Sequence, residues 1–170
     1  MKPDLRLSFR VYFFGLWLLI PGVVIAQKTG VSVTLHADRI ELKDGAAVSN
    51  PVTSVKPGDV VEYSSVYRND SNAAVQQLRA VIPIPVGSTY QAGSAVPAGA
   101  QASLNGVDFE PIPIQRNVRQ PDGSDRLMPV PLTDYRALRW TLPTLPPAQN
   151  STARLRVRID TAVTAVAAKP

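Results

Sequence analysis

The sequence predicts an all-β fold: an antiparallel β-sandwich of immunoglobulin-like type with about seven strands. Three observations predict this fold class. Apolar and polar residues alternate along several short segments, turn-forming residues separate these segments, and helical periodicity is nearly absent. A β-barrel built from similar strands is the alternative architecture.

The first 26 residues have the pattern of a secretory signal peptide. A basic start with Lys2, Arg6 and Arg10 precedes an uncharged apolar run that Pro21 interrupts. The run is shorter than the ~20 residues that span a bilayer comfortably. We therefore expect residues 1–26 to be removed on export, the alternative being an uncleaved membrane anchor.

The remainder of the chain divides into one domain, residues 27–160, and a short flexible tail, residues 161–170. The chain has no cysteine, which excludes cysteine catalysis, thiolate metal sites and thiol redox chemistry. Loss of residues 1–26 removes three of the 18 basic and one of the 13 acidic residues, so the net charge falls from +5 to +3. This small excess does not indicate a nucleic-acid partner.

The first predicted strand is the segment "VSVTLHAD", residues 31–38. Its strict alternation places Val33 and Leu35 on a buried face and His36 on the solvent face. The Asp-Gly pair at positions 44–45 then indicates a turn.

The next strand lies within "PGDVVEYSSVYRND", residues 57–70. Its proline and glycine suit the two central positions of a turn in which the glycine has a positive φ. Tyr63 and Tyr67 share a face with Val61, so we expect these rings to belong to the core. A sugar-binding platform made of the two tyrosines and Trp140 is the less favoured alternative.

A further single strand and a hairpin follow. In "VQQLRAVIPIP" the alternation continues to Pro83 and Pro85, which cannot donate ladder hydrogen bonds, so this strand ends there or lies at a sheet edge. In "QASLNGVDFE" the Asn-Gly pair at 105–106 predicts a two-residue type I′ hairpin. This turn would pair Leu104 with Val107 and, two residues further out, Ala102 with Phe109.

Residues 111–135 are rich in proline and arginine and contain only a short possible strand. We expect the longest irregular stretch of the chain here, either as a functional loop or as a stiff connection across one end of the sheet. The candidate interaction residues in this loop are Arg116, Arg119 and Arg126.

The last strand, residues 152–160, has the clearest alternation, with Leu155 and Val157 inward. Three arginines face outward about 7 Å apart. They are either a basic stripe for anionic envelope polymers or lipids, or a solvated face with acidic neighbours across the strands. The members of this stripe are Arg154, Arg156 and Arg158. The predicted core consists of Val33, Leu35, Val61, Tyr63, Leu78, Ile82, Trp140, Leu155 and Val157.

Two segments, residues 55–95 and 138–159, resemble the bacterial conserved-repeat domain known as domain of unknown function eleven. The first has Pro57-Gly58-Asp59, a strand with a tyrosine, an Asn-rich turn and a Pro-containing second strand; the second has a tryptophan, a Leu-Pro turn and a final strand. The resemblance implies an extracytoplasmic immunoglobulin-like module. This chain differs in having a single copy and in its Pro/Arg-rich insert.

Few residues point to catalysis or metal binding. His36 is the only histidine and nothing resembles a nucleophile elbow, so a solvated strand residue is the simpler interpretation. Asp122 and Asp125 in "PDGSD" supply too few oxygens for calcium, and Asp122 suits a turn with a local side-chain bond. We therefore expect no catalytic residue, no metal and no cofactor.

The sequence thus favours a non-enzymatic bacterial envelope protein, periplasmic or at the cell surface, that serves as a structural or protein-interaction module. Its partner would be an envelope or surface protein, held at an exposed sheet edge or at the loop 111–135, with membrane contact only through the signal segment. The alternatives are a ligand- or polymer-binding domain and a hydrolase with its site in that loop.

Overall fold

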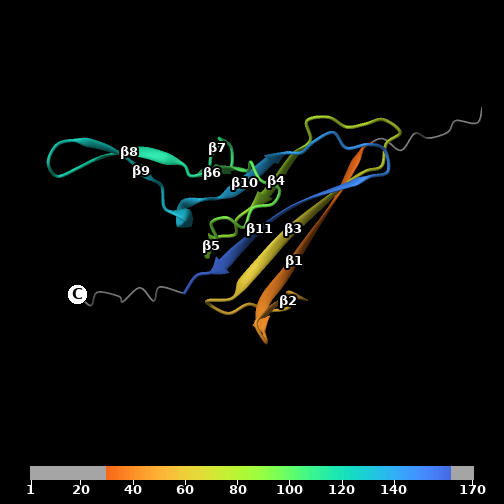
Figure 1. Ribbon diagram of the computed structural model, residues 1–170, viewed down its shortest axis with the longest axis horizontal. Helices are drawn as coiled ribbons and strands as arrows, with labels where there is room; N and C mark the ends of the chain where they lie inside the picture. Colours follow the sequence, from red (N-terminus) through yellow and green to blue (C-terminus); the bar gives the residue numbers. More distant parts are fainter. Residues whose placement is uncertain (1–29, 162–170) are drawn as a thin grey trace, which may run out of the picture.

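The computed structural model describes residues 30–161, which form an all-β structure of antiparallel sheets consistent with a β-sandwich (Figure 1). The expected signal peptide, residues 1–26, lies outside the described residues, as do residues 162–170 of the expected tail. The described part contains eleven strands rather than about seven, because several segments expected as turns or loops form short strands.

The strands form two sheets and a separate hairpin. The five-stranded sheet has the order β2-β1-β3-β11-β5 and the four-stranded sheet the order β4-β10-β6-β7, while β8 and β9 pair with each other as a two-stranded sheet. The elements are β1 (Val31–Lys43), β2 (Ala46–Pro51), β3 (Val60–Asn69), β4 (Arg79–Pro83), β5 (Ser88–Tyr90), β6 (Gln101–Ser103), β7 (Glu110–Pro111), β8 (Gln115–Arg119), β9 (Asp125–Pro129), the 3₁₀ turn η1 (Leu132–Asp134), β10 (Ala137–Thr141) and β11 (Asn150–Ile159).

Two predicted turns are present in the five-stranded sheet, one between β1 and β2 and one directly before β3. Asp44 (φ 53°) and Gly45 (φ 79°) join β1 to β2 as the left-handed pair of a tight hairpin. Gly58 has φ 91°, and the Asp59 N–H donates to the Lys56 carbonyl at 3.0 Å, as the turn chemistry of its segment predicts.

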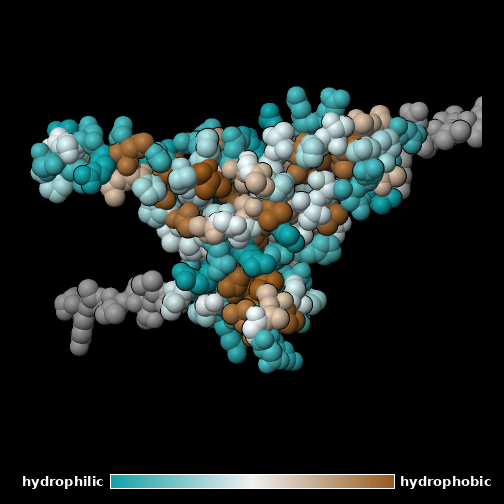
Figure 2. All heavy atoms as spheres, in the orientation of Figure 1, coloured by the Kyte–Doolittle hydropathy of each residue, from teal (hydrophilic) through white to brown (hydrophobic). Residues whose placement is uncertain are grey.

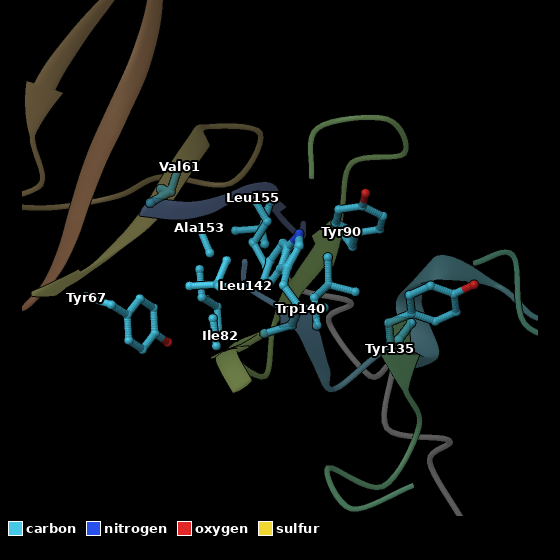
Figure 3. Packing of buried hydrophobic residues seen from close by; sticks show 14 of the residues in the cluster. Val61, Tyr67, Ile82, Tyr90, Tyr135, Trp140, Leu142, Ala153 and Leu155 are labelled. Carbon is cyan, nitrogen blue, oxygen red and sulfur yellow. The ribbon is translucent and has the colours of Figure 1, made fainter. Parts of the chain in front are cut away.

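The core lies between the two sheets, with Trp140, Leu142 and Leu155 at its centre (Figure 3). Trp140 is 1% exposed, and its indole N–H donates to the Pro97 carbonyl at 2.8 Å. The hydroxyl of buried Tyr67 accepts from the Val81 N–H at 3.2 Å. Both rings therefore belong to the scaffold, which confirms the core interpretation over the sugar-platform alternative.

The predicted core is confirmed where the two sheets face each other and is wrong at β1. Val33 and Leu35 do share a face with Tyr67, but their exposed fractions are 56% and 54%. The four-stranded sheet packs against β3 and β11 and does not extend over β1. The buried members of the predicted core are Val61, Ile82, Trp140, Leu155 and Val157, and the partly buried members are Tyr63 and Leu78.

The hairpin at Asn105 forms with a different register from the predicted one. Ala102 pairs with Glu110 rather than with Phe109. The Asn105 side-chain oxygen accepts from the N–H groups of Val107 and Asp108, both at 2.9 Å, and so widens the loop beyond two residues. Side-chain bonds of an asparagine here replace the backbone pairing that the Asn-Gly pair favours.

The proline-bearing strand lies where its chemistry predicts. β4 is an edge strand of the four-stranded sheet and ends at Pro83. Ile82 on its inner face is fully buried, whereas Val81 on the other face is exposed.

Candidate functional site

The segment expected as an irregular loop, 111–135, is instead built around an ordered hairpin that projects from the body of the molecule (Figure 1). We call residues 115–129 the arm. β8 and β9 pair in register from Gln115 opposite Pro129 to Arg119 opposite Asp125. All residues of both strands are exposed, so neither face of the arm packs on the rest of the described chain.

The base of the arm is tied to the core through Ile114, which is 1% exposed. The Ile114 N–H donates to the Tyr135 hydroxyl at 3.0 Å, and the Ile114 carbonyl accepts from the Val130 N–H at 2.8 Å. Tyr135 is fully buried and stacks on Tyr90 with ring centroids 6.2 Å apart. Burial raises the pKa of Tyr90. The arm thus leaves the body from a rigid support.

The tip of the arm is closed by a local side-chain turn. Asp122 Oδ1 accepts from the Ser124 N–H at 2.8 Å and from the Ser124 hydroxyl at 2.7 Å. The bond from the hydroxyl, and to a smaller extent the bond from the N–H, lowers the pKa of Asp122. Asp125 contacts Arg119 at 3.4 Å. The predicted local bond of Asp122 is confirmed. Within residues 30–161 no group of three or more His, Asp or Glu side chains is placed to hold a metal ion.

Charged pairs occupy the two ends of the arm, and apolar side chains lie between them. Near the base, Arg116 binds Glu110 through both guanidinium nitrogens, and this hydrogen bonding lowers the pKa of Glu110. Arg126 makes no ion pair within the described part of the chain. The exposed apolar side chains of the arm are Val118, Leu127 and Met128. In Figure 2 the tip of the arm is hydrophilic, with apolar atoms nearer its base.

The arginine stripe on β11 forms a second, separate group. Arg154 and Arg158 are exposed, but Arg156 Nε lies 2.8 Å from Glu62 Oε2 on the neighbouring strand. An acidic neighbour across the strands was the alternative to a binding stripe, and it neutralises the central arginine. A hollow of about 240 Å³ beside it is lined by Glu62, Gly93, Ser94, Val96, Arg154 and Arg156. The six candidate arginines therefore do not form one site.

The histidine is remote from the candidate loop. His36 lies on β1, in register with Ser64 of β3, and is exposed. Its side chain makes no hydrogen bond or ion pair with any residue between 30 and 161. The arrangement of nucleophile, base and orienting acid that hydrolysis by a triad requires is not assembled around it.

Comparisons with known proteins leave the family open. No protein-family model matches the sequence, and no match was found among curated proteins or among solved structures. Within residues 30–161 the structure has no helix long and apolar enough to cross a membrane.

Sequence reasoning located the arm region but missed its form. The alternation of "QRNVR" and "DRLMP" around "QPDGS" is a hairpin signal, since a turn-forming stretch separates two short runs. Pro121 and Pro129 obscured it, because proline inside a run argues against a strand. Here Pro129 stands at the end of β9, and Pro121 lies in the turn.

Proposed function

We propose that this chain is a non-enzymatic bacterial envelope module that binds a partner protein through the arm. The observation that carries the proposal is an ordered hairpin with both faces exposed, fixed at its base to buried Ile114 and Tyr135. An isolated two-stranded hairpin has little stability of its own in water, so a rigid support that presents one is best explained by what the hairpin contacts.

The side chains of the arm suit a protein partner. Methionine and arginine are enriched at protein interfaces, and the arm combines Met128 and Leu127 with Arg126. No other strand in the described part of the chain pairs with the outer edges of β8 and β9, so an extended segment of a partner can add to them by main-chain hydrogen bonds. The exposed ion pairs at its base and tip each add a small stabilisation to the paired strands.

Export to the envelope rests on the sequence. The first 26 residues have the signal-peptide pattern, and two segments resemble domain of unknown function eleven. Members of that family look like extracytoplasmic modules, and this chain departs from them in its single copy and in the Pro/Arg-rich insert that contains the arm.

The test replaces residues 116–128 by Asn-Gly, which joins Gln115 to Pro129 through a tight turn and keeps the buried Ile114 and its bonds. Cross-linked envelope fractions from cells producing each tagged full chain are purified and compared. We expect the partner captured by the unchanged protein to be lost on shortening the arm, while the thermal unfolding midpoint stays within a few degrees.

The matched control is the double variant Arg154→Glu/Arg158→Glu, which alters exposed residues of the stripe and leaves the arm intact. Retention of the partner by this variant supports the arm as the contact site. If the short-arm protein still captures every partner, the arm is not the contact site. If only the stripe variant loses binding, and binding of anionic polymer weakens with salt, the polymer-binding alternative replaces the proposal.

A further inference from the structure

The first half of β1, residues 31–37, is an open edge of the five-stranded sheet. Strand β2 pairs with β1 only from Asp38 onward, with one further bond from the Val52 N–H to the Ala37 carbonyl at 3.0 Å. On the other side of β1, the pairing with β3 runs from Val31 to Ile40. Within residues 30–161, the segment 31–37 therefore has a neighbouring strand on one side only.

Two hydrogen bonds establish which backbone groups face the open side. The Asp70 N–H donates to the Gly30 carbonyl on the β3 side, and the Ala37 carbonyl accepts on the β2 side. Because backbone direction alternates along a strand, even-numbered residues face β3 and odd-numbered residues face the opening. The N–H and C=O groups of Val31, Val33 and Leu35 thus point away from β3, where β2 does not reach.

The side chains of these residues add an uncovered apolar face. Val33 and Leu35 lie on the core side of the sheet, beyond the reach of the four-stranded sheet, and are more than half exposed. Natural edge strands are usually protected by proline, by charged side chains or by a bulge. Residues 31–37, "VSVTLHA", contain no proline and no Asp, Glu, Lys or Arg.

We propose that this edge pairs antiparallel with the same edge of a second copy, so that two five-stranded sheets join across a two-fold axis. A closed pair requires one patch that is complementary to itself. In the register that places Val33 opposite Leu35 of the partner subunit, apolar residues meet apolar residues on the core side. Thr34 then meets its own copy at the axis on the outer side, and no like charges oppose each other.

The size of the contact sets the expected strength. Stable interfaces bury about 1,600 Å² in total, and a seven-residue edge with two apolar side chains per copy supplies less than this. We therefore expect a dimer in equilibrium with the monomer. The proposal is independent of the arm, which lies on a different part of the fold.

The oligomeric state of the full chain is measured by sedimentation velocity over a wide range of protein concentration. Val33→Pro removes an N–H that faces the opening and no bond to β3, and Leu35→Lys places a charge on the exposed face. Each variant should raise the dimer dissociation constant at least ~tenfold, equal to about 1.4 kcal/mol, without changing the fold. The matched control Val86→Lys changes a 94%-exposed valine elsewhere and should leave the dimer intact.

A cross-linking experiment tests the register. The chain has no cysteine, so a single introduced cysteine can form a disulfide only between copies. Thr34→Cys should give a disulfide-linked dimer under mild oxidation, because side chains at this kind of strand pair approach most closely. Thr152→Cys, an exposed threonine on β11 of the same sheet, should stay monomeric. A monomer at every concentration, a dimer unaffected by both edge variants, or equal cross-linking at both sites would overturn the proposal.

Discussion

At the scale of single residues, Asn69 makes four side-chain hydrogen bonds from a fully buried position. It is fully buried at the end of β3, and its amide donates to the carbonyls of Ala73 at 2.7 Å and Leu145 at 2.9 Å. Its oxygen accepts from the Ser71 N–H at 3.0 Å and from the Ser71 hydroxyl at 2.6 Å. This side chain joins the loop after β3 to the segment before β11.

We expect Asn69→Ala to lower the free energy of unfolding by about 3 kcal/mol, because it removes the four hydrogen bonds of a fully buried side chain. Denaturant unfolding of both proteins measures the difference. Asn50→Ala, at an exposed position of β2, is the matched control and should change stability by no more than about 0.5 kcal/mol. Equal effects at the two positions would contradict the assigned role of Asn69.

Residue-level prediction from sequence succeeds where a side chain has one simple preference. The inward phase of Val61 and Leu155 and the positive φ of Gly58 follow from alternation and turn chemistry. Asn69 was read only as part of a polar turn. Its burial depends on Leu145, which is 76 positions away in sequence, and no local pattern shows that contact.

At the scale of elements, a solvent-exposed charged pair lies at the base of the arm. Glu110 stands on β7 and Arg116 on β8, and their bidentate contact holds the first part of the arm against the edge of the four-stranded sheet. The bonding that lowers the pKa of Glu110 also raises the pKa of Arg116.

Because the pKa of Glu110 is lower in the folded than in the unfolded chain, the pair stabilises the fold above the unfolded pKa. That contribution is lost as the pH falls through the folded pKa. We expect NMR titration of the Glu110 carboxyl to give a pKa below that of an ordinary glutamate, and Arg116→Gln to return it to the ordinary value. Arg119→Gln is the control, and an effect of equal size there would argue against the contact.

Elements were predictable from sequence wherever alternation and burial coincide, as in β3 and β11. The predicted register of the 105–106 hairpin is wrong because Asn105 forms hydrogen bonds through its side chain. The predicted burial of Val33 and Leu35 on β1 is wrong because the extent of the opposite sheet is a tertiary property. Arg116, Arg119 and Arg126 lie on the exposed strands of the arm rather than in a loop. That Arg156 is neutralised by Glu62 depends on β3 and β11 being neighbours.

At the scale of the whole molecule, the described chain has a well-packed centre and two sparsely supported extremities. Strands β3 and β11 have partners on both sides and bury their inner faces, whereas every residue of β2 and of the arm strands is exposed. In Figure 2 apolar side chains are also visible at the surface where the β1–β2 hairpin lies. Local opening should therefore be easiest at the two hairpins.

We expect amide hydrogen exchange, followed by mass spectrometry, to be slowest in β3, β10 and β11 and fastest in β2 and the arm. The exchange rates of the central strands should change together when denaturant is added, since they share one core. Protection of the arm as strong as that of β3 would show a contact between the arm and another surface. Slow exchange at residues 31–37 that disappears on dilution would reflect association of β1.

The strand directions also have a mechanical consequence. β1 and β11 both run antiparallel to β3, which lies between them, so they run parallel to each other. β1 begins opposite Asn69 and β11 ends beyond Arg158 opposite Val60, at the two ends of β3. Tension between the two ends of the domain would therefore pull β1 and β11 in opposite directions along their length. Both hydrogen-bonded ladders would be loaded in shear at the same time instead of opening one bond after another, which is the geometry that best resists pulling in a tethered protein.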